Sequence, residues 1–262
     1  MAQTSIAETP AASPAQNIRR ITFADLRWAL DKGRADFMAK PSHMVFLSII
    51  YPLVALIASR LTFGYEILPL LFPLCAGFAL VGPVAAIGLY EISRRRELGE
   101  TPSWRDAFAV TRSPGIRAVG HVALVLAVLF VLWLLAAYLI YTVTLGGAPG
   151  SVGAFLGAVF TTGAGWALIV LGNGVGLVFA AVVLTISVVS VPMILDRHVS
   201  AAAAIRTSVQ AVRTNPVPMA AWGLVVVAGL VIGATPAFVG LAITVPILGH
   251  ATWHLYRRTV AA

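Results

Sequence analysis

The sequence predicts an all-α membrane protein with six transmembrane helices, arranged as three hairpins that each follow a cytoplasmic interfacial amphipathic helix. Of its 262 residues, 59% are hydrophobic and only 11% are charged, whereas soluble domains contain about 25% charged residues. The apolar residues form runs long enough to cross a hydrocarbon layer of about 30 Å. The basic residues gather in alternate loops, which indicates a fixed orientation in a membrane.

Six apolar runs mark the expected spans. They are residues 43–59, 68–91, 117–141, 165–195, 217–235 and 237–256. The fourth span could instead begin later, with residues 155–161 as a short helix that lies outside the bilayer or dips into it. All but one of the 18 Lys and Arg residues fall on one side of these spans, the exception being Arg60. The positive-inside rule makes that side cytoplasmic and places both termini there.

Charge and composition also bear on partners. The net charge of +8 is spread over loops beside the spans, which favours retention at anionic headgroups over nucleic-acid binding. A single cysteine, Cys75, rules out an internal disulfide and any multi-thiolate metal centre within one chain. Residues 1–17, rich in Ala, Ser, Pro and Thr, are expected to form a disordered cytoplasmic tail. Residues 18–262 then form a single membrane domain.

Each span that leaves the cytoplasm follows an amphipathic segment and a proline. The segments are "ITFADLRWALDKGRADFMAKP", "SWRDAFAVTRSP" and "SAAAAIRTSVQAVRTNP", and their apolar residues recur at helical spacing. Thr22 with Asp25, and Ser103 with Asp106, match a helix N-cap followed three residues later by an acid. Ser200 can cap the third segment. Such helices are expected to lie at the cytoplasmic interface with their apolar faces on the membrane.

The returning spans support an internal repeat. "PVAAIGLYEISRR" aligns without gaps to "PILGHATWHLYRR", and "PMILDRHVS" is a looser counterpart. We therefore expect pseudo-repeats over about residues 22–98, 101–198 and 199–258. The prolines that open the three runs are expected to kink their helices and free backbone carbonyls. They are Pro83, Pro246 and Pro192.

His250 and His254, one helical turn apart, are the most conspicuous candidates for a site. Counting back from Arg257 at about 1.5 Å per residue, they lie roughly 10 and 5 Å inside the membrane. His121 and Glu91 share this shallow layer. We interpret all four as polar groups at the cytoplasmic boundary, which hydrogen-bond to headgroups, water or neighbouring helices. The alternative is a metal or haem site built from the same four side chains. No cofactor is expected on the first interpretation.

Glycines at small-xxx-small spacing predict close packing of helices. The pairs are Gly172 with Gly176 and Gly229 with Gly233. No predicted strand precedes the "GNGVG" run at the first pair, so it is not a dinucleotide-binding fingerprint. The sequence has no nucleophile–base, Walker or zinc-protease motif, and no charged residue near the middle of a predicted span. These features predict that the protein is not an enzyme.

The run "ISVVSVPMILDRHVSAAAAIRTSVQAVRTNPVPMAAWGL", followed by "VPILGHATWHLYRR", resembles the bacterial integral-membrane family labelled domain of unknown function 2189. The similarity extends from about Ile18 to Val260, and "GHATWHLYRR" is its most specific part. The resemblance implies a multi-pass protein of the bacterial inner membrane. It implies no activity and no catalytic residue.

Three functions are consistent with these features. The first is a non-enzymatic scaffold, assembly factor or accessory protein that packs against lipid, another membrane complex or itself. The second is a transporter or channel for a small neutral or apolar solute, which the mid-membrane prolines would suit. The third is a haem- or metal-binding membrane protein, which the boundary histidines would suit. The lack of buried charges and the small-residue helix faces favour the first.

Overall fold

The chain is helical through most of the residues that the computed structural model describes, which are 17–39, 68–147, 150–236 and 239–261. The helices are α1 (Phe23–Ala39), α3 (Leu68–Ala85), α4 (Ile87–Glu97), η2 (Trp104–Arg112), α5 (Ile116–Thr144), α6 (Val152–Thr161), α7 (Gly163–Ser187), α8 (Ser190–Arg197), α9 (Ala201–Thr214), α10 (Pro216–Ala234) and α11 (Leu241–Thr259). The first predicted span, residues 43–59, lies outside the described residues, as do residues 1–16 of the predicted tail.

Within the described residues, four helical stretches are long and apolar enough to cross a membrane. They are Phe72–Glu97, Ile116–Thr144, Gly163–Arg197 and Pro216–Ala234. They coincide with the second to fifth predicted spans, although the second divides into α3 and α4 and the fourth into α7 and α8. The helix α11 covers most of the sixth predicted span but is not among the four, because polar and basic residues fill its second half. The short helix considered beside the fourth span is present as α6.

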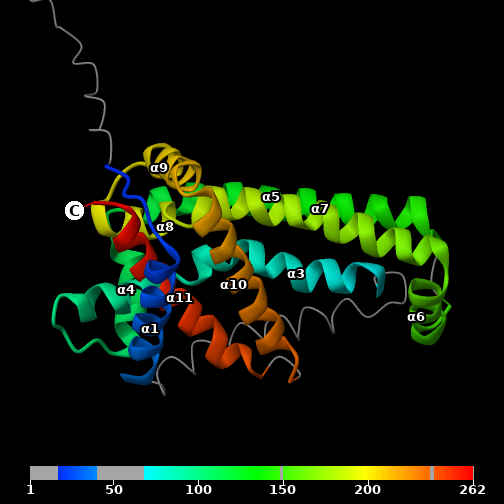
Figure 1. Ribbon diagram of the computed structural model, residues 1–262, viewed down its shortest axis with the longest axis horizontal. Coiled ribbons are helices and arrows are strands. Elements are labelled where there is room, and N and C mark those ends of the chain that lie inside the picture. Colours follow the sequence, from blue (N-terminus) through cyan, green and yellow to red (C-terminus); the bar gives the residue numbers. More distant parts are fainter. Residues whose placement is uncertain (1–16, 40–67, 148–149, 237–238, 262) are drawn as a thin grey trace, which may run out of the picture.

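The helices α3, α5 and α7 run along the long axis of the molecule (Figure 1), and α5 packs against both of the others. Trp133 of α5 lies at their contact. Its indole N–H donates to the Pro73 carbonyl of α3 at 2.8 Å, and its ring centroid lies 5.8 Å from that of Phe179 in α7. A large buried ring whose N–H has a partner holds these three helices in one arrangement.

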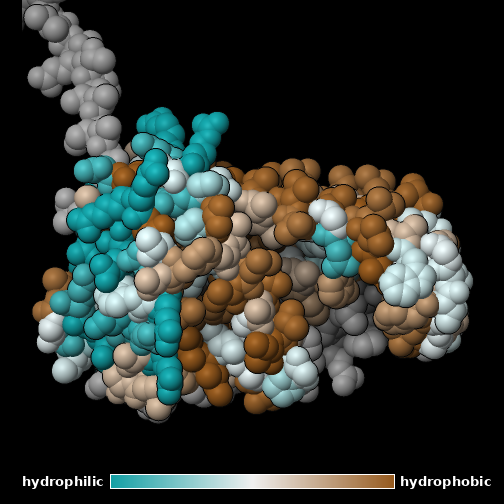
Figure 2. All heavy atoms as spheres, in the orientation of Figure 1, coloured by the Kyte–Doolittle hydropathy of each residue, from teal (hydrophilic) through white to brown (hydrophobic). Residues whose placement is uncertain are grey.

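The outer faces of the spans remain apolar. In the most apolar stretch of α5, only 17% of the stretch is buried inside the protein, and the share is the same in α10. Leu124, Leu135 and Leu224 are examples, with 63%, 53% and 68% of their surface exposed. Figure 2 shows hydrophobic side chains over the long body of the molecule and hydrophilic ones gathered at the end that holds α1, α4 and α9. An apolar body next to a polar end is the surface that a membrane-spanning bundle needs.

The two described ends of the chain meet at this polar end. The Arg19 N–H donates to the Thr259 carbonyl at 2.8 Å, beside the antiparallel bridge between residues 18 and 260. Asn215, at the junction of α9 and α10, is 3% exposed. Its Oδ1 accepts the Ile21 N–H at 2.8 Å, and its Nδ2 donates to the Arg19 carbonyl at 3.0 Å. Both described ends therefore lie on the same side of the spans.

At the start of each of the three amphipathic segments a predicted cap residue forms a side-chain bond to the backbone. The Thr22 N–H donates to the Asp25 carboxylate at 2.9 Å at the start of α1. Ser103 and Asp106 form a capping box at the start of η2, which is a 3₁₀ helix. The Ser200 hydroxyl accepts the N–H of Ala203 at 3.3 Å at the start of α9. Each cap satisfies an N–H group that has no partner inside its own helix.

Much of the apolar face of α1 is buried within the protein, where the sequence predicted contact with the membrane. Leu26, Gly33 and Phe37 are buried, and α1 packs chiefly against α11. A Cβ on Gly33 would come within 2.6 Å of both the Ile247 carbonyl oxygen and the Ala251 nitrogen. The two helix backbones therefore approach closely at Gly33, and α11 takes the place that the membrane was expected to fill.

Candidate functional site

A buried carboxylate, Asp36 of α1, joins three helices at the polar end. Ser93 Oγ of α4 donates to Asp36 Oδ2 at 2.6 Å, and Arg96 Nε of the same helix donates to Oδ1 at 2.9 Å. His254 Nε2 of α11 lies 2.9 Å from Oδ2. His250, one turn earlier on α11, places its Nδ1 2.6 Å from Ser93 Oγ. We refer to these five side chains as the Asp36 cluster.

The positions of the protons in the Asp36 cluster follow from which groups can donate. A carboxylate only accepts, so His254 donates its Nε2–H to Asp36. The Ser93 hydroxyl has one hydrogen, which it donates to Asp36, and its oxygen lies 2.6 Å from Nδ1 of His250, whose ring also bonds to the Leu89 backbone. Burial would raise the pKa of Asp36, but hydrogen bonds from His254 and Ser93 and the nearby histidines outweigh it and hold the pKa below its ordinary value.

Four of the five members of the Asp36 cluster are closed to solvent, and the fifth, Arg96, is partly exposed. Ser93 and His250 are 0% exposed, Asp36 is 6% exposed and His254 is 8% exposed. A buried polar group must find partners within the protein, and here the partners come from separate helices. The cluster therefore acts as a polar joint that fixes α1 and α11 to α4.

Acid is expected to weaken this joint through Asp36. Because the folded pKa lies below the ordinary value of about 4, the unfolded chain binds more protons as the pH falls through that value, and the stabilisation is lost as the pH passes the folded pKa. His250, His254 and Arg96 are the titratable or charged groups that face Asp36. We expect the loss of melting temperature in Asp36→Asn, relative to the wild type, to shrink below about pH 4.

Thermal melts of the detergent-purified chain between about pH 3 and 6, followed by circular dichroism, measure this effect. Asp31→Asn, an exposed position on the same helix, is the matched control and should melt like the wild type at every pH. A difference between wild type and Asp36→Asn that grows on acidification would show that the sign is wrong.

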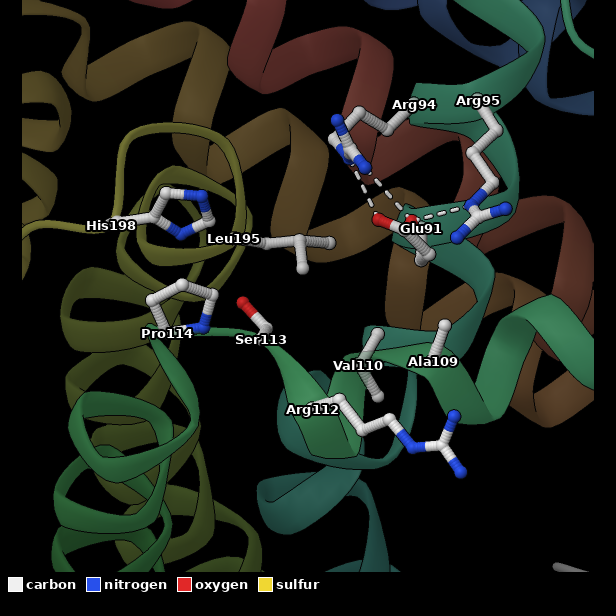
Figure 3. Close-up of a pocket in the computed structure, with 10 residues that line it drawn as sticks. All are labelled: Glu91, Arg94, Arg95, Ala109, Val110, Arg112, Ser113, Pro114, Leu195 and His198. Carbon is white, nitrogen blue, oxygen red and sulfur yellow. Dashed lines mark hydrogen bonds and ion pairs between the residues drawn. The ribbon is translucent and has the colours of Figure 1, made fainter.

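The polar end also contains a cavity of about 210 Å³ between α4, η2, α8 and the start of α5. The polar side chains of its wall are Glu91, Arg94, Arg95, Arg112, Ser113 and His198. Figure 3 shows His198 and Ser113 on one side of the cavity and Glu91 with its two arginines on the other. His198 has φ 52° and ends α8 in the left-handed conformation, which turns its ring toward this space.

Glu91 is fully engaged in the wall of the cavity. Arg94 donates to both carboxylate oxygens, at 2.7 and 2.9 Å, and Arg95 donates to Oε1 at 2.7 Å. Arg95 also donates to Asp106 at 2.8 Å and so ties η2 to α4. Such charge-assisted hydrogen bonds are roughly twice as strong as those between neutral groups. They hold the arginines at the rim of the cavity.

The four side chains considered as metal ligands do not form one group. His250 and His254 belong to the Asp36 cluster, Glu91 lies in the cavity wall, and His121 is exposed on α5. In the parts of the chain that the structure describes, no group of three or more His, Cys, Asp or Glu side chains could hold a metal ion. Three of the four, His250, His254 and Glu91, instead form hydrogen bonds with other side chains of the protein. The interpretation of these residues as polar groups at the membrane boundary includes bonds of this kind.

Asp36 and Ser93 were missed as partners of the histidines. Asp36 lies beside Phe37 and one turn after Gly33, on the side of α1 that the apolar stripe predicts to be buried. An acid on that side of an amphipathic helix is the signal that could have identified it. Ser93 gives no such signal, because the sequence around it indicates only the polar end of a transmembrane helix.

The three kink prolines occupy different positions in their helices. Pro83 lies in α3 just before the break at Ala86, and Pro246 lies inside α11 without ending it. Pro192 is in the first turn of α8, directly after the break from α7. Its missing N–H cannot bond to the carbonyl four residues earlier, which accounts for a break at that point.

The paired glycines differ in their surroundings. A Cβ on Gly229 would lie 2.9 Å from the Leu248 side chain of α11, and one on Gly233 would clash with Thr244 of the same helix. On Gly176 a Cβ would lie 3.1 Å from the Trp133 ring. At Gly172 a Cβ would meet no atom within 4 Å among the described residues. Close approach of helices is therefore seen at three of these positions.

Comparison with known families finds one match. Residues 71–196 match the model of the family described as "Predicted integral membrane protein (DUF2189)". The match covers the second, third and fourth predicted spans and ends at Asp196, so the "GHATWHLYRR" run lies outside the matched residues. Neither the curated proteins nor the solved structures contain a match to this chain. Together with the four apolar stretches, the family match identifies an integral membrane protein.

Proposed function

We propose that this chain is a non-enzymatic protein of the bacterial inner membrane, a scaffold, assembly or accessory component whose polar end faces the cytoplasm. The asymmetric distribution of basic residues supports this orientation. The pairing of both described ends at the polar end is consistent with an even number of spans. Six spans would require residues 43–59 and α11 in addition to the four apolar stretches. The cytoplasmic face would then contact anionic headgroups.

The closure of the Asp36 cluster is the observation that carries this proposal. Serine, histidine and aspartate are the side chains that many hydrolases and transferases use. Here Ser93, His250 and Asp36 are at most 6% exposed and bond to one another across helices. Their use as a structural joint argues against a reaction at this place. The uncovered apolar faces of α5 and α10 provide surface for lipid, a membrane complex or a second copy.

Affinity purification of the tagged full-length chain from native membranes tests the proposal. The expected result is a defined set of membrane proteins that co-purify in fixed ratio and do not co-purify with an unrelated multi-span protein tagged in the same way. Recovery of the chain alone, together with saturable uptake of a solute by proteoliposomes that contain only this chain, would overturn it.

Such uptake would support the transporter alternative, which the helix break after Pro83 favours. Pro83→Ala and Pro246→Ala would then lower the flux, because they remove the two points at which the helices can bend.

A further inference from the structure

We propose that the cavity at the polar end binds a phosphate-type oxyanion. Its volume of about 210 Å³ is several times the about 30 Å³ that one water molecule occupies in the liquid. Three arginines, Arg94, Arg95 and Arg112, and His198 line the cavity together with one carboxylate, Glu91. The Arg112 side chain lies at the edge of the cavity, with its guanidinium directed away from Glu91 (Figure 3). Even with Arg95 assigned to Asp106, two guanidinium groups remain for a single carboxylate. The wall therefore has an excess of positive charge.

Arg112 is the arginine that Glu91 does not hold. It is exposed at the end of η2, and none of the ion pairs within the described residues involves its guanidinium. A guanidinium presents several N–H groups in a plane that matches two oxygens of a phosphate. The Ser113 hydroxyl and the His198 ring stand across the cavity from Glu91 and can each donate to a third oxygen (Figure 3).

The position of the cavity relative to the spans indicates where the oxyanion would come from. Ser113 and Pro114 line the cavity, and the apolar stretch Ile116–Thr144 begins directly after them. The cavity therefore lies where the polar end meets the apolar body, which is the level of lipid phosphates in a bilayer. The start of α5 adds the partial positive charge of a helix N-terminus. A lipid headgroup and a free phosphate share the same chemistry, and the experiment separates them.

Glu91 acts as an internal competitor for the anion. Its carboxylate already takes up hydrogen bonds from Arg94 and Arg95 at 2.7–2.9 Å. Replacing it with glutamine keeps the shape of the side chain and removes the negative charge. Glu91→Gln is therefore expected to bind the anion more tightly, by about tenfold, while Arg112→Gln binds it about tenfold more weakly. Because each shift also has the sign expected from the change in net charge, Arg213→Gln, which removes the same charge away from the cavity wall, separates a local effect from a general one.

Titration calorimetry of the purified full chain in neutral detergent provides the first arm of the test. Sodium phosphate is compared with sodium chloride at equal ionic strength, for the wild type and four variants. Besides Glu91→Gln and Arg112→Gln, Ala109→Leu fills the cavity without changing charge and should weaken binding. Arg213→Gln removes one exposed positive charge on α9, away from the cavity wall, and should leave binding unchanged.

Native mass spectrometry provides the second arm, with dioleoylphosphatidylglycerol and, as a control with the same acyl chains but no phosphate, dioleoylglycerol. Binding of inorganic phosphate identifies a free anion as the ligand. Binding of the phospholipid alone, with the same order among the variants, identifies a headgroup. No response in either arm, or equal losses in Arg112→Gln and Arg213→Gln, would overturn the proposal. The inference does not rest on the scaffold role and would survive its failure.

Discussion

Replacing Asp36 with alanine is expected to destabilise the polar end by about 3–5 kcal/mol, the cost of removing one partner from a buried ionic network. The change leaves the Ser93 hydroxyl and the His254 Nε2–H without their acceptor and leaves Arg96 without its counter-charge. A loss of this size lowers the melting temperature by about 10 °C in a chain of this length. Thermal melts of the detergent-purified protein, followed by circular dichroism, measure it.

The matched control for this variant is Asp31→Ala. Asp31 lies on the same helix and carries the same charge, but it is exposed, so its removal should change stability by less than about 0.5 kcal/mol. Hydrogen exchange adds a local reading, because the amides of α1 should lose protection in Asp36→Ala alone. If Asp36→Ala melts like the wild type, the cluster does not hold the three helices together.

Replacing Gly33 with alanine is expected to have the second-largest effect, a destabilisation of about 2–3 kcal/mol. The added methyl group would lie within 2.6 Å of the Ile247 carbonyl oxygen and the Ala251 nitrogen, and these backbone atoms cannot turn aside as a side chain can. The α1 helix would have to move away from α11, and the bonds of Asp36 to His254 would lengthen. The higher helix propensity of alanine offsets only about 1 kcal/mol of this cost.

Gly120→Ala provides the comparison for Gly33→Ala. Gly120 also lies inside a helix, α5, but a Cβ there meets no atom of the described part of the chain within 4 Å. It should therefore stabilise the chain by up to about 1 kcal/mol through helix propensity alone. Parallel melts of the two variants should shift in opposite directions. Stabilisation by both would mean that α1 and α11 are not in close contact at Gly33.

The apolar spans could be predicted because their signal is local. A long uncharged run such as Ile116–Thr144 needs a lipid environment whatever surrounds it, and the prolines and hydroxyl caps mark where helices begin or bend. The packing of α1 could not be predicted in the same way. Its amphipathic pattern fits either a membrane surface or a protein groove, and only the close approach at Gly33 decides between them.

Only part of the candidate site could be predicted, because only part of it has a local signal in the sequence. His250, His254 and Glu91 were identified from their spacing and depth, since charged or polar residues in an apolar run stand out. Their partners were not. Asp36 is 218 residues from His254 in sequence, and the pairing exists because α1 folds back onto α11. The cavity was also missed, because it is formed by η2, α4 and the end of α8, which meet only in the folded chain.

Labelling of single cysteines in intact bacterial cells tests the central claim most directly, which is that the polar end faces the cytoplasm and the spans lead away from it. In a Cys75→Ser background, one cysteine replaces Arg213 on α9 at the polar end and another replaces Gly150 just before α6 at the far end (Figure 1). A membrane-impermeant maleimide should label Gly150→Cys in intact cells and Arg213→Cys only after permeabilisation. Labelling of Arg213→Cys in intact cells would contradict the orientation and with it the proposed function.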